Sequence, residues 1–454
     1  MKQVSFKLFA TVILLTGILV QSCSKKGGDD NNPDPGPGTG NTNTGETETM
    51  KLIPDPVFRA YLKANVCPNA FDATGKYIDI TNSEVKNFSG TMTIDTINCP
   101  RPFVASLKGM EYFQKMTKLM VWGSTIDTLN LPKTMALDSV RLFENKDLQY
   151  VNVSGLTNMR YFKAINMPVV SLNLSNLPSL EYVTLQFMGR LTDLKVENSS
   201  NLRHLITISL TALKTVNTST NPELRRLYFQ YGYALNALDV TKNRKLRMLI
   251  TSYCTPLKSV DLSKNDSLRM VNFDDSGIDS IDFSHNPELI SVAMLRTPLR
   301  NLNFLANPKL KLLYLDGCAQ LKNVDLRAQT SFDYYQIELG KYMQLPDHVA
   351  FEVLQDGMMA LDQSEIFSVP MKASRLGVNG GTGNYFGGLR LPIFQDAGAV
   401  SLAQVKVNDA IKDNYSLVMS RRVVGTQPAL ITVYASDKTT VLCNDYDPNI
   451  FRCN

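Results

Sequence analysis

The chain contains 454 residues, of which 44% are hydrophobic and 20% are charged, as in a folded protein and unlike a disordered chain or a polytopic membrane protein. Its 47 Lys and Arg residues exceed its 42 Asp and Glu residues by only five, so the charge does not indicate a nucleic-acid partner. Three histidines, His204, His285 and His348, are few for a histidine-based metal site or a catalytic triad. We therefore expect no metal ion, no cofactor and no enzymatic activity, and the length predicts more than one structural unit.

Residues 1–22 have the features of an export signal. Lys2 and Lys7 precede an apolar run from Leu8 to Val20 that is too short to span a bilayer as a stable helix. The run ends in Val20-Gln-Ser-Cys23, which resembles the lipobox of bacterial lipoproteins. That resemblance implies cleavage before Cys23 and acylation of Cys23, with palmitate among the attached chains. The alternative is an ordinary secretory signal with an incidental cysteine.

Residues 23–49 predict a disordered tether. They are almost all Ser, Lys, Gly, Asp, Asn, Pro and Thr, which bury too little apolar surface to offset the entropy of ordering. A lipidated cysteine followed by such a tether resembles the surface or periplasm-facing lipoproteins of Gram-negative bacteria. Ser24 favours the outer membrane by that resemblance, and the side of that membrane stays open.

A repeat of 21 or 22 residues fills residues 126–340. Apolar residues recur at places 1, 4 and 6 of each unit, and again at places 12, 15 and mostly 17. The spacing of two residues between places 4 and 6 is the alternation of a β-strand. At the larger gaps the chain must turn a corner, which brings the next apolar residue back to the inside. The pattern predicts one right-handed coil per unit. The ten units start at Ile126, Leu148, Val169, Leu191, Leu213, Leu235, Leu257, Ile278, Leu299 and Leu321.

Asparagine occupies place 9, between the two halves of the coil, in five successive units. A side-chain amide there can bond backbone groups of its own turn and of the adjacent coil, which predicts an asparagine ladder. The whole pattern resembles the leucine-rich repeat in its short bacterial form, over roughly residues 50 to 340. That resemblance implies an α/β-type solenoid that is β-rich with few helices. The predicted ladder residues are Asn221, Asn243, Asn265, Asn286 and Asn307.

Residues 50–125 predict a helical cap and the first coil. Asp55 and Pro56 have the character of an N-cap and a first helical residue, and an apolar helical face follows. Residues 53–62 and 107–113 resemble the N-terminal cap of bacterial repeat lipoproteins. In those proteins an acidic, calcium-binding-like loop often follows, but Lys76 and Tyr77 occupy two of the corresponding places here. An ordinary cap loop is the expectation.

Six cysteines remain after Cys23. Cys254 and Cys318 occupy the same repeat place three coils apart, about 14 Å at ~4.8 Å per coil, beyond the ~7 Å limit for a disulfide. They are expected to be buried thiols. Two further pairs lie close enough in sequence to staple the ends of the protein, and both disulfides are hypotheses: Cys67 with Cys99, and Cys443 with Cys453. A reactive or metal-bound cysteine is the weaker alternative, because no Cys-x-x-Cys occurs.

The outward strand places differ between the two halves of the coil. Place 5 carries mostly Asn and Asp and is expected to be a solvated structural face. Places 14 and 16 carry large, varied and partly apolar side chains of the types enriched at recognition surfaces. The alternative is that the C-terminal segment covers these side chains, or that the surface is simply uneven. The predicted partner-binding residues are Arg141, Tyr161, Lys163, Tyr182, His204, Arg226, Tyr228, Met248 and Tyr314.

After residue 340 the period stops, and short β-rich runs predict a small, sandwich-like all-β domain over residues 341–454. The favoured function is a lipid-anchored recognition scaffold for a protein or glycan partner outside the cytoplasm. One alternative is a carbohydrate-active or other hydrolytic enzyme with its site in the C-terminal domain, where Asp347, Glu352, Asp356 and Asp362 offer carboxylates. Another alternative is a purely structural or adhesive surface protein.

Overall fold

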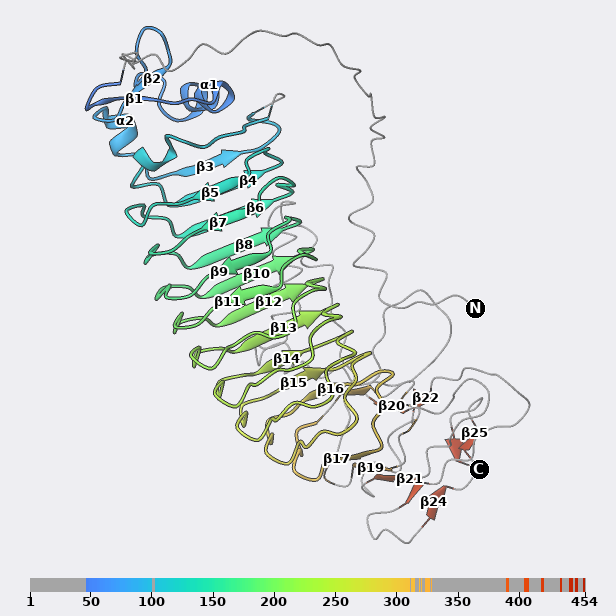
Figure 1. Ribbon diagram of the computed structural model, residues 1–454. Helices are drawn as coiled ribbons and strands as arrows, with labels where there is room; N and C mark the ends of the chain where they lie inside the picture. The colour runs from blue at the N-terminus through green and yellow to red at the C-terminus, as the bar shows by residue number, and fades with distance from the viewer. Residues whose placement is uncertain are drawn as a thin grey trace, which may run out of the picture. The chain divides into compact units, whose positions relative to one another are not determined.

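The computed structural model describes residues 46–99 and 103–310, together with short segments between residues 312 and 453. These residues lie in one compact unit that begins at Gly45 (Figure 1). The predicted signal peptide, nearly all of the predicted tether and Cys23 lie outside the described residues.

A helical cap covers the first coil, as the sequence predicts. Helix α1 spans Pro56–Asn65, and Asp55 Oδ1 accepts hydrogen bonds from the backbone N–H groups of Val57 and Phe58, both at 2.8 Å. The second oxygen, Oδ2, accepts from the N–H groups of Ala105 and Ser106 at 2.8 and 3.0 Å. One carboxylate therefore starts the helix and ties it to a loop fifty residues further along the chain.

The rest of the cap is small. Strands β1 (Met50–Leu52) and β2 (Tyr77–Asp79) pair antiparallel, and two short helical segments follow, α2 at Ser83–Lys86 and a 3-10 turn at Met110–Tyr112. The apolar face of α1 is buried through Phe58, Tyr61 and Leu62. This face covers the end of the stack, which would otherwise expose its core.

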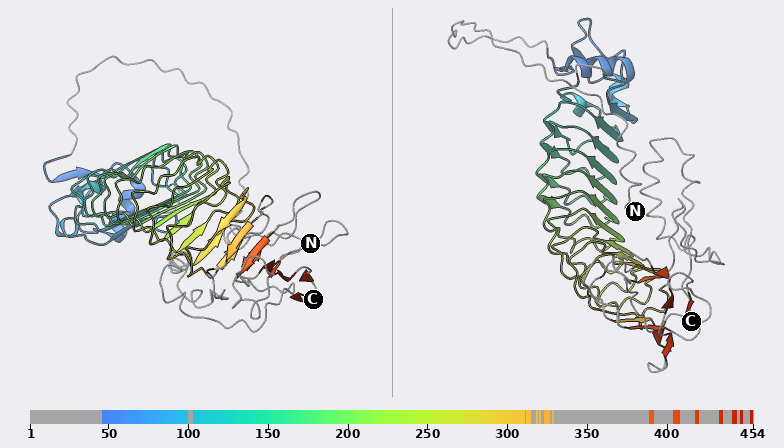
Figure 2. Two further views of the ribbon diagram at one scale, coloured as in Figure 1. Left: turned by 90° about the horizontal axis from the view of Figure 1, so that it is seen from below. Right: turned by 90° about the vertical axis from the view of Figure 1, so that its right-hand side faces the viewer.

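One long parallel sheet runs through the stacked coils. Neighbouring strands of this sheet come from successive repeat units, and they pair without a change of register. Figure 2 shows the coils lying one on another along the length of this unit. The strands, in order through the sheet, are β3 (Thr91–Ile94), β4 (Lys118–Trp122), β6 (Ser139–Phe143), β8 (Tyr161–Ile165), β10 (Tyr182–Gln186), β12 (His204–Ile208), β13 (Arg226–Gln230), β14 (Met248–Ile250), β15 (Met270–Asn272), β16 (Ser291–Ala293), β18 (Leu312–Tyr314), β20 (Leu389–Leu391) and β22 (Val418–Met419).

The other half of each coil forms only short strands. These pair in parallel between neighbouring coils: β5 (Thr128–Asn130) with β7 (Tyr150–Asn152), β9 (Ser171–Asn173) with β11 (Asp193–Lys195), and β17 (Asn301–Asn303) with β19 (Asn323–Leu326). Strands β21 (Gln404–Val407) and β23 (Val433–Tyr434) extend the last of these sheets in parallel, and β24 (Val441–Cys443) pairs antiparallel with β23. A separate antiparallel pair joins β25 (Tyr446–Asp447) and β26 (Arg452–Cys453).

Of the C-terminal strands that the structure describes, β20 to β24 join the sheets of the solenoid, whereas β25 and β26 form a separate pair. Strands β20 and β22 lie in the long sheet, and β21 and β23 lie in the second one. The predicted sandwich-like domain over residues 341–454 stays a prediction, because most of that segment lies outside the described residues.

The parallel-strand solenoid is therefore the fold that the repeat predicts. All nine described unit-start residues, from Ile126 to Leu299, are buried, while Leu321 lies outside the described residues. The place-5 row is exposed or half-exposed from Asn130 to Asn303, as expected of a solvated face. Seven of its Asn and Asp side chains accept a hydrogen bond from the backbone N–H two residues on, as Asp239 does from the N–H of Thr241 at 2.8 Å.

The asparagine ladder is confirmed. All five predicted asparagines are completely buried, and each side-chain amide donates two hydrogen bonds to backbone carbonyls. Asn265 Nδ2, for example, donates to the carbonyls of Val240 at 3.0 Å and Asn243 at 2.9 Å. One coil before the ladder starts, Ser199 stands at the same place and donates from Oγ to the carbonyl of Leu174 at 2.8 Å. Each ladder residue thus ties its own turn to the preceding coil.

One disulfide prediction is wrong and one expectation about thiols is confirmed. Cys67 and Cys99 are both free and buried, so the cap is not stapled by a bond between them. Burial raises the pKa of Cys67 to about 12 and that of Cys99 to about 11, because each thiol is enclosed in the apolar cap. Cys254 and Cys318 are both buried and are not bonded to each other, as the coil geometry predicts. The predicted bond between Cys443 and Cys453 involves side chains outside the described residues.

Candidate functional site

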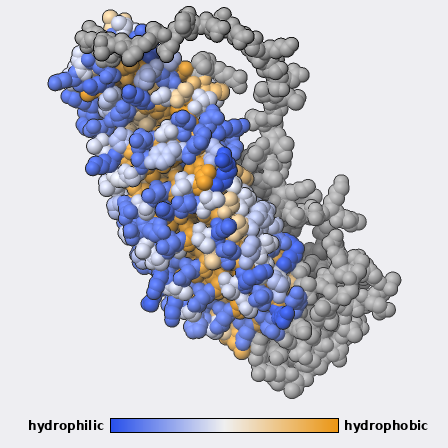
Figure 3. Space-filling view, viewed as in Figure 1, coloured by the Kyte–Doolittle hydropathy of each residue, from blue (hydrophilic) through white to orange (hydrophobic). Residues whose placement is uncertain are grey.

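The outward face of the long sheet carries two rows of predicted binding residues. Because the strands are in register, the first residue of each strand faces the first residue of the next one, and the third faces the third. Figure 3 shows apolar side chains as a band that follows the stack, between hydrophilic margins. The first row contains Ser139, Tyr161, Tyr182, His204, Arg226, Met248, Met270 and Ser291, and the second contains Arg141, Lys163, Thr184, Ile206, Tyr228 and Ile250.

A stack of rings occupies the middle of the first row. The ring centroids of Tyr161 and Tyr182 are 4.8 Å apart with planes 8° from parallel, and those of Tyr182 and His204 are 4.6 Å apart at 4°. The next residue, Arg226, places Nη1 3.5 Å from Nδ1 of His204. Four successive coils thus form one continuous, rigid π and cation surface, since each ring limits the rotation of its neighbours.

The second row carries positive charge and a fixed hydroxyl. Lys163 Nζ lies 5.8 Å from the ring centroid of Phe143, which is a cation–π distance. Tyr228 donates a hydrogen bond from its hydroxyl to Gln230 Oε1 at 2.9 Å. Both side chains are held by contacts along the sheet, so their positions are largely fixed.

The predicted residues are less exposed than free surface side chains. Lys163, His204, Arg226 and Met248 expose 9%, 7%, 8% and 2% of their area. Arg141, Tyr161, Tyr182 and Tyr228 are half-buried. The strand spacing of ~4.8 Å explains part of this burial, because a ring stacked between two neighbours shows solvent only its edge. The side chain of Tyr314, in β18, lies outside the described residues.

His204 has an unusual electrostatic environment. Burial and then the charges of Arg226, Arg225 and Arg203 lower the pKa of its imidazole to about 3. The side chain is therefore neutral at physiological pH and stacks as a neutral aromatic ring. Burial is the larger cause of the shift, and the three arginines add to it because their charges disfavour the protonated imidazole.

Sequence reasoning missed a row of arginines beside the ring stack. Arg203, Arg225, Arg247 and Arg269 all stand at place 13, one residue before the first outward row. The backbone N–H of each arginine after the first donates to the carbonyl of the preceding one, as from Arg225 to Arg203 at 2.9 Å and from Arg247 to Arg225 at 2.8 Å, while the N–H of Arg203 donates to the carbonyl of Glu181 at 2.9 Å. The sequence signal is the recurrence of arginine at place 13 in four successive units, one place before the predicted outward places 14 and 16.

Further arginine and aromatic side chains lie beside the first row, on the coils nearer the cap. Arg160 places its guanidinium carbon 5.3 Å from the ring centroid of Tyr161 and pairs with Glu181 at 3.0 Å, and Arg203 pairs with the same carboxylate at 3.3 Å. Trp122 is 52% exposed and lies 5.9 Å from the ring of Phe143, measured between centroids. The surface therefore extends toward the cap, where it becomes more aromatic.

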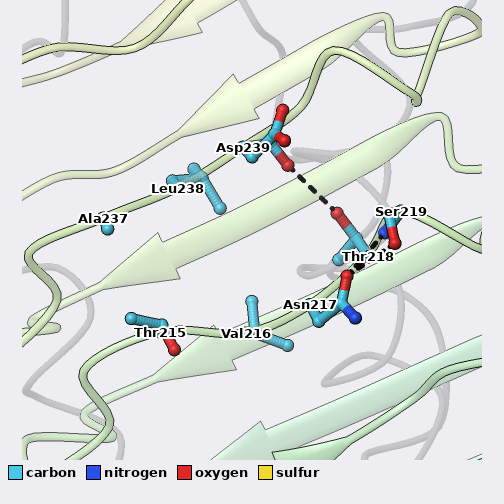
Figure 4. A pocket seen from close by; sticks show the side chains of 8 residues that line it. All are labelled: Thr215, Val216, Asn217, Thr218, Ser219, Ala237, Leu238 and Asp239. Atoms are coloured by element: carbon cyan, nitrogen blue, oxygen red, sulfur yellow. Dashed lines mark hydrogen bonds between the residues drawn. The ribbon is translucent and has the colours of Figure 1, made fainter.

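A shallow depression lies on the opposite half of the coils, away from these rows (Figure 4). Its polar groups already serve the turns: Asn217 Oδ1 accepts from the N–H of Ser219 at 3.1 Å, and Thr218 donates to Asn243 Oδ1 at 2.9 Å. These groups are not available to orient a ligand. The lining residues are Thr215, Val216, Asn217, Thr218, Ser219, Ala237, Leu238 and Asp239.

The acidic cap loop is occupied by its own hydrogen bonds. Asp72 Oδ2 accepts from the hydroxyl of Thr74 at 2.6 Å, and Oδ1 accepts from the N–H groups of Lys76 and Tyr77 at 3.0 and 3.1 Å. These bonds lower the pKa of Asp72 to about 2. Across residues 46–99 and 103–310, no three His, Cys, Asp or Glu side chains gather as metal ligands.

Within the part of the chain that the structure describes, no helix has the length and apolarity needed to cross a membrane.

Comparisons with solved structures return leucine-rich repeat proteins at low sequence identity. An internalin from Listeria monocytogenes is 14% identical, with a TM-score of 0.32 over 62% of this chain and 91% of that one. The functional domain of InlJ from the same bacterium, which includes a cysteine ladder, is 19% identical, with a TM-score of 0.26 over 63% of this chain and 78% of that one. Toll in the Drosophila Toll–Spatzle complex is 15% identical, with a TM-score of 0.31 over 49% of this chain and 39% of that one. No known family and no curated protein matches the chain.

Proposed function

We propose that this chain is a lipid-anchored recognition protein that binds a protein partner across the outward face of its long sheet, outside the cytoplasm. The observation that carries the proposal is the continuous row from Tyr161 through Tyr182 and His204 to Arg226, in which ring centroids are 4.6 to 4.8 Å apart. Tyr and Arg are the side chains over-represented among binding hot spots. Rigid aromatic side chains contribute contact area at a low entropic cost.

Stacked coils suit an extended partner. Each coil adds one residue to each row, so a ligand lying along the stack meets the same kind of position every ~4.8 Å. Affinity then comes from several modest contacts, with the ring stack as the anchor.

The anchor belongs to the same proposal. Cys23 follows an apolar run and precedes a polar segment, and acylation there would hold the solenoid at the outer membrane. Replacing Cys23 with alanine should move the protein from the membrane fraction to the soluble fraction, as followed by immunoblotting. Unchanged fractionation would remove lipidation at Cys23 from the proposal.

The test of recognition uses the full-length protein in detergent micelles as bait on arrays of extracellular proteins and of glycans. Tyr182→Ala should weaken every specific hit about tenfold or more, because it removes the middle ring of the stack. Tyr150→Ala is the matched control, since Tyr150 is an exposed tyrosine on β7, in the other half of its coil. Equal losses from both variants, or none from Tyr182→Ala, would refute this surface.

The enzymatic alternative stays a prediction without structural support. Its carboxylates, from Asp347 to Asp362, lie outside the described residues.

A further inference from the structure

An exposed apolar patch lies at the cap end of the long sheet, apart from the two rows described above. Ile97 exposes 86% of its area, more than any other large apolar side chain of the residues that the structure describes, and Trp122 exposes 52%. Phe143 pairs with Trp122 in register on the next strand, with 5.9 Å between the ring centroids. These three residues form the cap-end patch. Strands β3 and β4, beside which it lies, are the strands of the long sheet nearest the helical cap (Figure 1).

A hydrogen-bonded turn fixes the backbone at Ile97. Asp95 Oδ1 accepts hydrogen bonds from the backbone N–H groups of Ile97 at 3.0 Å and Asn98 at 2.7 Å. The carbonyl of Asp95 accepts a further one from the N–H of Cys99 at 2.8 Å. The isoleucine is therefore held in water by an ordered turn, although leaving water would be favourable for its side chain.

The same turn lies beside the end of β4. Strands β3 and β4 pair in register up to the residue before Trp122. A Cβ atom on Gly123 would lie 3.4 Å from Cγ2 of Thr96, so the turn and the end of β4 are almost in contact. Single exposed apolar residues are ordinary, but a group of them on adjacent coils marks a contact surface.

Resting on the lipid anchor of the proposed function, we propose that the cap-end patch inserts into the interface of the bilayer that carries the anchor. Tryptophan is enriched at the boundary between membrane and water, where its ring is partly apolar and its N–H stays hydrated. Apolar side chains gathered on one side of a structure enter the boundary between headgroups and acyl chains. Insertion takes Ile97 and the exposed part of Trp122 out of water.

The length of chain between the anchor and the cap favours the bilayer as the occupant. Only residues 24–45 separate Cys23 from Glu46, where the described residues begin. A Gly-rich chain of that length has a root-mean-square end-to-end distance of about 26 Å. From β3 to β18 the stack extends about 48 Å at ~4.8 Å per coil. An anchor at Cys23 therefore keeps the cap end, and with it the patch, closer to the membrane surface than the later coils.

The patch and the ring stack lie on different coils. Tyr161, the first ring of the stack, lies on β8, two strands after the strand of Trp122 and about 10 Å further along the stack. The bilayer and a protein partner can therefore be bound at the same time. Docking would hold the cap end at the membrane and leave the later coils accessible to the partner.

The test uses the fluorescence of Trp122, which is the only tryptophan in the chain. The full-length acylated protein is reconstituted into vesicles of phosphatidylethanolamine and phosphatidylglycerol, either plain or with brominated acyl chains, which quench a tryptophan that they contact. Brominated vesicles should quench Trp122. In plain vesicles its emission should lie at shorter wavelength than in the Ile97→Ser variant.

Two matched variants complete the test. Ile97→Ser should lower the equilibrium constant for docking about tenfold and restore most of the quenched emission, because the isoleucine no longer leaves water. Leu305→Ser is the control, since Leu305 is also exposed, at 45%, but lies between β17 and β18 on a late coil. It should leave the quenching unchanged. Both side chains are exposed, so neither substitution should change the unfolding temperature.

Three results would overturn the inference: no quenching by brominated chains, equal quenching of the wild type and Ile97→Ser, or an array protein whose binding is lost in Ile97→Ser. Vesicle flotation separates this inference from the anchor. A protein that floats without quenching keeps the anchor and overturns the patch. A Cys23→Ala variant that floats and is quenched as strongly as the wild type removes the anchor and keeps the patch. A wild-type protein that does not float removes both.

Discussion

Replacing Asn265 with alanine tests whether the asparagine ladder stabilises the stacked coils. Its amide donates to the carbonyls of Val240 and Asn243, and it is fully buried. Each of these carbonyls also accepts a backbone hydrogen bond, from the N–H of Asn243 at 2.9 Å and of Leu246 at 3.0 Å, so each keeps one partner in the variant.

The magnitude follows from these contacts. A net hydrogen bond contributes about 1 kcal/mol, which gives about 2 kcal/mol for the two that are lost. The void left by the amide adds about 1 kcal/mol, so the free energy of unfolding should fall by about 3 kcal/mol. Asn265→Asp should cost more at neutral pH, because a buried carboxylate cannot donate and would face two carbonyl oxygens.

Urea denaturation followed by circular dichroism measures both effects, and the midpoint gives the change if the slope is constant. Asp266→Ala is the matched control, because Asp266 is exposed in the same turn and, among the described residues, its carboxylate accepts a single hydrogen bond, from Ser267 Oγ at 3.2 Å. The control should change stability by less than about 0.5 kcal/mol. Equal midpoints for Asn265→Ala and Asp266→Ala would show that the amide bonds do not hold the coils together.

Three further predictions concern the cap, a buried acid and the thiols. Asp55→Ala removes the acceptor of four backbone N–H donors and should lower the free energy of unfolding by about 3 kcal/mol in the same urea assay, with Asp55→Asn costing less. Burial raises the pKa of Asp274 from 3.8 to about 6, so the contribution of Asp274 to stability should be fully present below pH 4 and should fall by up to about 3 kcal/mol as pH rises through 6, opposite in sign to the contribution of carboxyls with lowered pKa such as Asp72. Asp274→Asn should abolish this slope, and an unchanged slope would contradict the assignment. Cys67, Cys99 and Cys254 should react with a maleimide only after unfolding, and non-reducing mass spectrometry that found Cys67 bonded to Cys99 would contradict the structure.

Much of the cap and the solenoid could be predicted from the chain. A 21- or 22-residue period of Leu, Val and Ile can bury its apolar residues only if successive units stack, so the strand direction and the buried unit starts followed. Asn221 to Asn307 recur at one place, and a turn amide in that position has only the neighbouring coil to bond. Asp55 followed by Pro56 is a local signal, and it gave the start of α1 correctly.

The contacts between side chains in the candidate site could be seen only in the tertiary structure. The repeat brings Tyr161, Tyr182 and His204 to one row, but sequence does not show that their rings lie nearly parallel, or that Arg226 closes the stack. The Cys67–Cys99 prediction failed for a related reason, because shared membership of the cap does not bring two sulfur atoms into bonding geometry.

The repeat period, the asparagine ladder and the start of the cap helix were determined by residue type. The first two depend on chemistry repeated along the chain, and the third on the adjacent residues Asp55 and Pro56. The backbone conformation of the turn that follows each strand of the long sheet was determined by the tertiary structure. A positive φ of 53° to 60° is adopted by the residue that directly follows each of β6, β8, β10, β12 and β13, and by the third residue after each of the shorter strands β14, β15 and β16. None of these residues is glycine, and their types vary: Glu144, Asn166, Phe187, Ser209, Tyr231, Tyr253, Asp275 and Arg296. Left-handed backbone is unfavourable for most of these residue types, so no local preference predicts it. Stacking on the neighbouring coil imposes the same turn on every unit, and the packing energy of the whole stack outweighs the cost at each residue.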